Sequence, residues 1–309
     1  MSVDLTDPIF TDEEAARKHF EALRWPNGPV CPHCEAVDQA TEMKGKTTRP
    51  GLYKCRACAK PFTATIGTVY ERSHIPLHKW LLATHLLCSS KKGMSAHQLF
   101  RMLGFGSYRT AWFMAHRIRE AMKPVGDAPL GSGGGIVEAD ETYIGRKKGV
   151  EKKGGGFGHK MKVMSLVERG GNVRSVVMDK VTRKEVERVI SENVAKEAHL
   201  RTDTAQYYIK GGFGTASHEM VNHYAGEYVR GDAHTNTLEG FYSVFKRGMK
   251  GVYQHCGEQH LHRYAVEFDF RYNTRTATGH NDTDRATKAI KGVAGKRLTY
   301  RQPDSADLH

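Results

Sequence analysis

The chain has 309 residues, of which 39% are hydrophobic, and 47 Lys and Arg against 34 Asp and Glu give it a formal net charge of +13. This hydrophobic content excludes a disordered chain, and the length allows two or three domains. A positive excess of this size indicates a polyanionic partner such as nucleic acid, the alternative being a basic surface that serves solubility only.

The apolar runs and the cysteines indicate the cellular location of the protein. No run approaches the roughly 18–20 apolar residues of a membrane span, and the acidic, polar start MSVDLTDPIFTDEEAARKHF lacks the pattern of a secretory signal. The six cysteines do not form a disulfide framework, since four of them cluster in pairs. We therefore expect a cytoplasmic, nucleoid-associated protein with a metal site and no membrane partner.

The first predicted helix runs from Asp12 to about Arg24. Thr11 followed by Glu14 forms a capping-box signal at its start, and its apolar residues Ala16, Phe20 and Leu23 share one face. Three more helices are predicted, over residues 76–87, 95–102 and 108–122. The glycine turn LGFGS separates the last two, which is the outline of a helix-turn-helix.

The stretch KPVGDAPLGSGGG, residues 123–135, cannot support a helix or a strand and predicts a domain boundary. Three strands follow it, IVEADETYI, MKVMSLVER and NVRSVVMDKV, then a helix over residues 183–195 and a short strand over 199–202. A weakly marked helix-strand unit and a long helix from about Thr235 come next. This order predicts an α/β domain on one mixed sheet, and the polar tail from about Thr276 is expected to be flexible.

The cysteine pairs predict a structural zinc site. Cys31-Pro-His-Cys34 and Cys55-Arg-Ala-Cys58 are separated by twenty residues, which is the spacing of a two-knuckle zinc ribbon. Each CxxC turn presents two thiolates, and four thiolates complete a tetrahedron with no open position for water. We therefore expect one structural Zn²⁺ and no catalytic role for it.

Basic residues lie along the helices of the predicted helix-turn-helix. The second helix could enter a major groove and bring its first residues to base edges, while arginines contact phosphates. The candidate DNA contacts of this region are Arg101, Arg109 and Arg117. Any pair of helices gives a similar trace, so a purely structural helix pair is the alternative.

Three acids predict a second metal site. Asp140 and Asp203 each lie where a predicted strand ends, and Glu239 lies on the helix that begins near Thr235. Asn236, three positions earlier, and Lys246, seven positions later, share a helical face with Glu239.

A few carboxylates that converge can hold two Mg²⁺ or Mn²⁺ ions for in-line phosphoryl transfer. In that arrangement Asp140 would bridge both ions, Asp203 would hold one and Glu239 the other. Asn236 is the alternative third ligand, and the neighbouring Glu138 and Glu141 are further candidates.

Four segments, RWPNGPVCPHC, VEADETYIG, HTNTLEGFYSVFKRG and FRYNTR, make the chain resemble a known family. It resembles bacterial insertion-sequence transposases of the ISXO2-like group, which carry an N-terminal zinc ribbon before a DDE-type, ribonuclease-H-like catalytic domain. The resemblance covers roughly residues 10–275. It matches Asp140, Asp203 and Glu239 to the family's acids, and Lys246 to the basic residue after the third acid.

The sequence patterns and the resemblance together give a domain organisation. We expect an N-terminal helix and zinc ribbon over 1–70, a helical DNA-binding region over 71–123, a linker over 124–135, a ribonuclease-H-like catalytic domain over 136–275 and a flexible tail over 276–309. The fold class is thus multidomain, with a zinc ribbon and a helix-turn-helix region before an α/β domain with a mixed sheet.

The resemblance also implies a function. We expect a transposase that binds the terminal inverted repeats of an insertion sequence as a homodimer or larger assembly, cuts double-stranded DNA and joins the freed 3′ hydroxyl to target DNA. The residues expected to neutralise backbone phosphates in the catalytic domain are Arg146, Lys147, Lys148, Arg247 and Lys250.

Three other hypotheses remain open. A zinc-ribbon DNA-binding regulator would bind DNA without metal-dependent cleavage. A nuclease or resolvase on the same fold would cut without joining strands. A transposase-derived protein that has lost catalysis would keep the motifs and show no chemistry.

Overall fold

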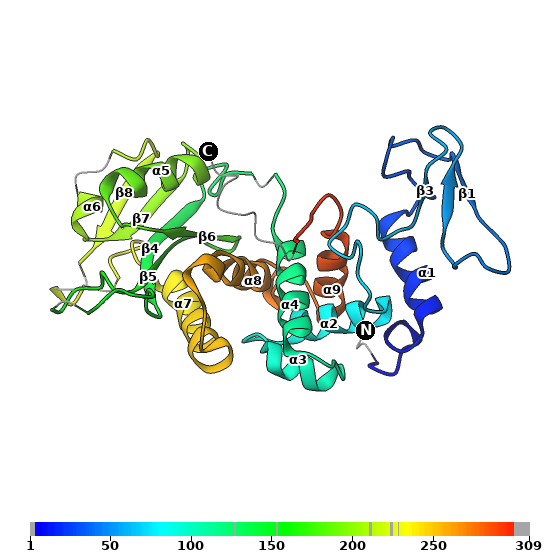
Figure 1. Cartoon of the computed structure of the whole chain (residues 1–309). Coiled ribbons are helices and arrows are strands. Elements are labelled where there is room, and N and C mark those ends of the chain that lie inside the picture. The colour runs from blue at the N-terminus through cyan, green and yellow to red at the C-terminus, as the bar shows by residue number, and fades with distance from the viewer. Residues whose placement is uncertain are drawn as a thin grey trace, which may run out of the picture. The chain divides into compact units, whose positions relative to one another are not determined.

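The protein was analysed as a computed structural model, which describes residues 4–126, 128–152, 154–209, 212–222, 225–227 and 229–299 (Figure 1). The chain divides into two compact units. The first contains the described residues up to Lys123 and from His280 onward, and the second runs from Pro124 to Gly279. None of the helices in the described ranges combines the length and apolar character that a membrane span needs.

The first unit begins with η1 (Pro8–Phe10) and α1 (Glu13–Arg24). The N-cap of α1 is Asp12, whose side chain accepts a hydrogen bond from the backbone N–H of Ala15 at 2.7 Å, so the prediction of Thr11 as the cap is wrong by one residue. Asp12 has extended backbone, as an N-cap requires, whereas Thr11 closes the preceding 3₁₀ turn.

The ribbon of the first unit contains three short antiparallel strands, β1 (Ala40–Glu42), β2 (Tyr53–Cys55) and β3 (Pro61–Phe62). The rings of Trp25, Tyr53 and Phe62 pack against one another, with centroids 5.7–5.8 Å apart. Three strands of two or three residues bury little apolar surface, so this ribbon needs a further source of stability.

Three helices follow the ribbon, as the sequence predicted: α2 (Leu77–Ser89), α3 (Ala96–Met102) and α4 (Tyr108–Met122). Ser95 caps α3 by accepting a hydrogen bond from the backbone N–H of Gln98 at 3.1 Å. α2 is buried over most of its circumference, including Trp80, Leu81 and Leu87, and forms the centre of this unit.

The expectation of a flexible tail is wrong over residues 282–291, which form helix α9 (Asp282–Lys291) in the first unit. Asn281 and Asp284 form a capping box at its start. Ala286, Ala289 and Ile290 are buried, and Arg285 donates to the carbonyl of Cys88 at 2.9 Å. Two of the three buried side chains are alanines, so the apolar face of α9 was too weak to stand out in the sequence. Residues 300–309 lie outside the described part of the chain.

The second unit is built on a five-stranded mixed sheet of order β6-β5-β4-β7-β8, which confirms the predicted mixed sheet. β5 pairs antiparallel with both β4 and β6, whereas β7 runs parallel to β4 and to β8. The strands are β4 (Ile136–Ile144), β5 (Met161–Glu168), β6 (Val173–Met178), β7 (His199–Asp203) and β8 (Ser217–Val221).

Helices cover both faces of this sheet (Figure 1). α5 (Arg183–Asn193) and α6 (Gln206–Ile209) pack on one face against Val137, Ala139 and Leu200. α7 (Asn236–Gly248) and α8 (Leu261–Asn273) pack on the other. Because side chains alternate along a strand, Glu138 and Asp140 face α7. The remaining turns of this unit are η3 (Met249–Tyr253), which is π-helical, η4 (Glu258–His260) and η5 (Thr276–Thr278).

The predicted linker, residues 124–135, falls in the second unit, and part of it is packed there. Leu130 is 3% exposed, and its backbone exchanges hydrogen bonds with Asn193 and Ala195 at 2.8 and 2.9 Å. Gly131 has a φ of +76°, and a Cβ there would lie 2.5 Å from the side chain of Ala198. Glycine is therefore required at this position for close packing as well as for the turn.

Candidate active site and metal centre

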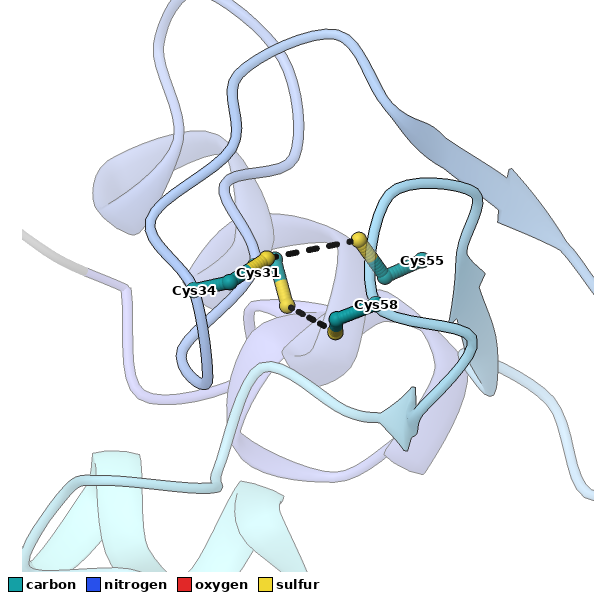
Figure 2. A group of neighbouring side chains, drawn as sticks. All are labelled: Cys31, Cys34, Cys55 and Cys58. Atoms are coloured by element: carbon teal, nitrogen blue, oxygen red, sulfur yellow. Dashed lines mark hydrogen bonds between the residues drawn. The ribbon is translucent and has the colours of Figure 1, made fainter.

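The four cysteines of the ribbon lie together (Figure 2). Their sulfur atoms all lie within 4.8 Å of one another, and the Cys31–Cys58 and Cys34–Cys55 sulfurs are 3.7 Å apart. Zn–S bonds of about 2.3 Å in a tetrahedron place sulfurs about 3.8 Å apart. The cluster therefore has the size and donor set of a structural zinc site, and its four thiolates fill the coordination shell.

Asp140 and Asp203 lie on neighbouring parallel strands of the second unit. The ladder between β4 and β7 pairs Glu138 with Arg201, and each aspartate lies two residues further along its strand on the same face. Asp203 is the last residue of β7, as predicted, whereas Asp140 is the fifth of nine residues in β4 rather than its end. The sheet thus brings the two predicted acids side by side.

The electrostatics of Asp140 reflect this arrangement. Burial raises the pKa of Asp140 well above its usual value, and the carboxylates of Glu141 and Asp203 raise it further, while Lys246 lowers it. The ionised form of Asp140 thus has too little positive charge nearby to stabilise it. A divalent cation that carboxylate oxygens could bind would supply it.

Helix α7 lies along this face of β4. The hydroxyl of Tyr242 donates to the backbone carbonyl of Asp140 at 2.5 Å and accepts from the backbone N–H of Ser165 at 3.0 Å. Lys246 lies over the ring of Tyr242, with its Nζ 5.7 Å from the centroid. Glu239 is exposed one turn before Tyr242 on the same helical face, and Asn236 is the exposed first residue of the helix.

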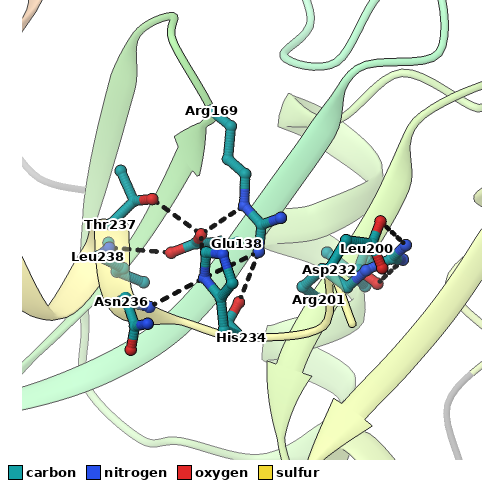
Figure 3. A network of polar contacts seen from close by, with 9 residues as sticks. All are labelled: Glu138, Arg169, Leu200, Arg201, Asp232, His234, Asn236, Thr237 and Leu238. Carbon is teal, nitrogen blue, oxygen red and sulfur yellow. Dashed lines mark hydrogen bonds and ion pairs between the residues drawn. The ribbon is translucent and has the colours of Figure 1, made fainter. Parts of the chain in front are cut away.

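The carboxylate of Glu138 fixes the start of α7 (Figure 3). It is fully buried, and its Oε1 accepts from the Nε of Arg169 at 2.7 Å and from the hydroxyl of Thr237 at 2.9 Å. Its Oε2 accepts from the backbone N–H of Leu238 at 3.0 Å, and His234 lies 3.3 Å from Oε1. Both oxygens are thus engaged by protein donors at the positive end of a helix. Glu138 therefore holds α7, and with it Glu239, against β4.

Replacing Glu138 with glutamine should lower the free energy of unfolding by about 2–4 kcal/mol, because the partly buried guanidinium of Arg169 and a helix-terminal N–H lose a charged, fully buried acceptor. Thr237→Val is the matched control, since it removes one hydrogen bond to the same carboxylate and should cost about 1 kcal/mol. Urea unfolding of both proteins measures the difference. Equal losses in the two variants would show that the charge of Glu138 is not needed.

Glu141 faces away from Asp140 and contacts α6. The hydroxyl of Tyr207 donates to its Oε2 at 2.6 Å, and the hydroxyl of Tyr208 donates to its Oε1. Burial raises the pKa of Glu141 to about 7. Its two oxygens are engaged by these tyrosines, which the sequence did not single out as partners.

The predicted DNA contacts of the first unit separate into exposed and buried residues. Arg101 on α3 and Arg109 on α4 are exposed. Arg117 is only 7% exposed, donates to the carbonyl of Glu71 at 2.7 Å and lies over the ring of Trp80. The structure therefore removes Arg117 from the predicted DNA contacts, because its guanidinium is used in packing the unit.

The predicted contacts of the second unit gather near Lys246. Arg146, Lys148 and Lys250 are exposed and line one cavity together with Lys246. Arg247 is exposed and donates to the carbonyl of Ser243 at 3.0 Å. Lys147 differs from its neighbours, since it forms an ion pair with Glu258 and its side chain is 16% exposed.

Sequence reasoning missed the residues that position the acids, among them Tyr242 and Arg169. Tyr242 could have been found from its spacing, because it lies three residues after Glu239 and four before Lys246. Arg169 could not have been found in this way, because it directly follows β5 whereas its partner Glu138 lies in β4.

Comparison with known proteins identifies the class of protein that this ribbon and this sheet define. Residues 11–61 match the transposase zinc-ribbon domain, and residues 133–273 match the ISXO2-like transposase domain. A relative from Halobacterium salinarum, described as an uncharacterized protein in transposable element ISH50, is 30% identical over 254 residues, which cover 77% of this chain and 83% of the relative.

The chain belongs to the ISXO2-like transposase family with an N-terminal zinc ribbon. The resemblance read from the sequence is confirmed, and the four-cysteine cluster is the structural zinc site of this ribbon. Membership of a transposase family implies DNA binding.

Proposed function

We propose that this transposase binds the terminal inverted repeats of its own insertion sequence and cuts and rejoins DNA with Asp140, Asp203 and Glu239 as catalytic acids. The observation that carries the proposal is the pair of aspartates on adjacent parallel strands, facing a helix that bears a third acid and a lysine. A sheet fixes two carboxylates rigidly, which is what two-metal phosphoryl transfer needs.

The fold of the second unit is proposed to be ribonuclease-H-like. The strand order β6-β5-β4-β7-β8 supports this, with three antiparallel strands first, then a helix and two strands parallel to the central one. In the first unit, α3 and α4 with their short glycine turn are proposed as a helix-turn-helix that presents Arg101 and Arg109 to DNA.

The donor chemistry of the site fits Mg²⁺ or Mn²⁺. Asp140 would be shared between two ions, with Asp203 and Glu239 completing the set, because ionised oxygens are the preferred ligands of these metals. Such ions supply charge stabilisation at the attacking and leaving oxygens of the phosphodiester. Asn236 is the second choice for the third position, since a neutral amide binds a hard cation more weakly than a carboxylate.

The residues around the acids have roles that follow from their contacts. Lys246, near Asp140 and held over Tyr242, is proposed to contact a phosphate of the strand being cut. Glu138 and Tyr242 position α7 and the β4 backbone. Arg146, Lys148, Arg247 and Lys250 are proposed to neutralise further phosphates, and Lys147 retains that role only if its ion pair with Glu258 opens. Because two ends must be joined, the active form is proposed to be a dimer or larger.

The test is strand cleavage and joining on labelled duplexes that carry the element's ends, which can be taken from the DNA flanking the coding sequence. We expect cutting and joining with Mg²⁺ or Mn²⁺ and none with EDTA. Cutting without joining would favour a nuclease or resolvase. Tight binding without chemistry under either ion would favour a regulator or an inactive transposase-derived protein.

A further inference from the structure

A large cavity opens beside Lys246 in the second unit. It has a volume of about 990 Å³, and its lining includes Glu141 and Lys246, of which Lys246 is proposed above to contact a phosphate of the strand being cut. The other charged side chains around it are mostly basic: Arg146, Lys148, Lys160 and Lys250, with Glu258 as the further acid. A cavity of this size and charge suits a nucleotide strand rather than a metal ion alone.

An aromatic pair also lines this cavity. The rings of Tyr143, on β4, and Phe157, on the glycine-rich loop that follows, are stacked with centroids 4.6 Å apart and an interplanar angle of 24°. Phe157 is 51% exposed, and the Nζ of Lys160 lies 5.1 Å from its centroid. Phe157 is thus held against Tyr143 while about half of its surface is open to solvent, which leaves a ring face available for stacking beside a lysine.

We propose that Phe157, backed by Tyr143, is a stacking platform for one unpaired base of the DNA end, next to the bond that is cut. This inference rests on the proposed function and adds to it the form of DNA that the site binds. Bases inside a duplex already stack on their neighbours, so only a base that has left its pair can offer a ring face to Phe157. The lysines and Arg146 would then hold the phosphates on either side.

Lys246 connects this pair with the proposed active site, because it lines the same cavity as Tyr143 and Phe157. Tyr143 lies three residues after Asp140 on β4, about 10 Å along the strand, and its side chain leaves the sheet on the opposite face because side chains alternate. A DNA strand that contacts Lys246 would therefore pass the end of β4 before one of its bases reaches Phe157.

The experiment crosses a protein change with a DNA change. Phe157→Leu and Phe157→Trp are each tested on the intact element end and on ends that lack one base at successive positions beside the cleavage site. On intact DNA, Phe157→Leu should weaken end binding and cleavage by about 5- to 150-fold, and Phe157→Trp should retain both. On DNA lacking the stacked base, Phe157→Leu should cause no further loss.

The outcomes separate the two proposals. Val150→Ala, which alters another exposed apolar side chain of the same loop, is the matched control and should leave activity unchanged. If the wild-type protein cuts its ends and Phe157→Leu cuts them equally well, the platform is overturned and the proposed function stands. The same holds if Phe157→Leu loses as much activity on every abasic DNA as on the intact end. A wild-type protein that neither binds nor cuts its ends overturns both.

Discussion

Replacing Asp140 with alanine should reduce metal-dependent strand cleavage by about 10³-fold or more while binding of the element's ends stays within a few-fold of wild type. The expected loss, about 4 kcal/mol of transition-state stabilisation, follows from the role of Asp140 as the ligand shared by both proposed ions. Cleavage and gel-shift assays on the same labelled ends measure both quantities. Wild-type cutting by Asp140→Ala would remove this residue from the site.

Asp140→Asn adds a readout that does not depend on catalysis. Burial and the carboxylates of Glu141 and Asp203 hold the pKa of Asp140 well above its usual value, so ionised Asp140 destabilises the metal-free protein. The neutral amide should therefore raise the stability of the metal-free protein at neutral pH while abolishing cleavage. Glu192→Gln, on an exposed face of α5, is the control and should change neither.

Replacing Cys31 with serine should remove the single zinc ion and unfold the ribbon. Structural zinc contributes about 10–16 kcal/mol of binding free energy in small zinc domains, and strands of two or three residues cannot replace it. Metal analysis should fall from one zinc per chain to none, and amide exchange over residues 27–62 should become fast. Exchange in β4 and β5 should stay slow, because they belong to the other unit.

Cys256→Ser is the matched control, since Cys256 lies in the second unit and takes no part in the cluster. It should keep one zinc per chain and a protected ribbon. Retention of zinc by Cys31→Ser would mean that Cys31 is not a required ligand. Fast exchange throughout both units would contradict the independence of the second unit from the ribbon.

Local patterns predicted most of the elements of this chain. The spacing of Cys31–Cys34 and Cys55–Cys58 predicted the metal cluster, since each CxxC pair forms a tight turn that can be recognised from the sequence. The alternation of β4 and the helical pattern from Thr235 predicted the strand and the helix that carry Asp140 and Glu239. These features depend on neighbours within a few residues, so they can be read without the fold.

Long-range contacts decided the rest. The placement of Asp140 near Asp203 depends on the register of two strands about sixty residues apart, which no local pattern specifies. Arg117 looked like a DNA contact because its charge is visible in the sequence, whereas its burial against Trp80 is not. Glu138 looked like a candidate metal ligand beside Asp140, yet its partners come from α7 and the end of β5.

The return of α9 to the first unit has a consequence for how the protein is made. Translation at ~5–20 residues per second reaches α9 roughly ten to thirty seconds after α4 has been synthesised. The first unit therefore stays incomplete while the whole second unit is being synthesised. A premature stop after Gly279 would release a chain that has every proposed catalytic acid but lacks α9, the helix that packs on α2. Errors late in translation should therefore destabilise the N-terminal unit.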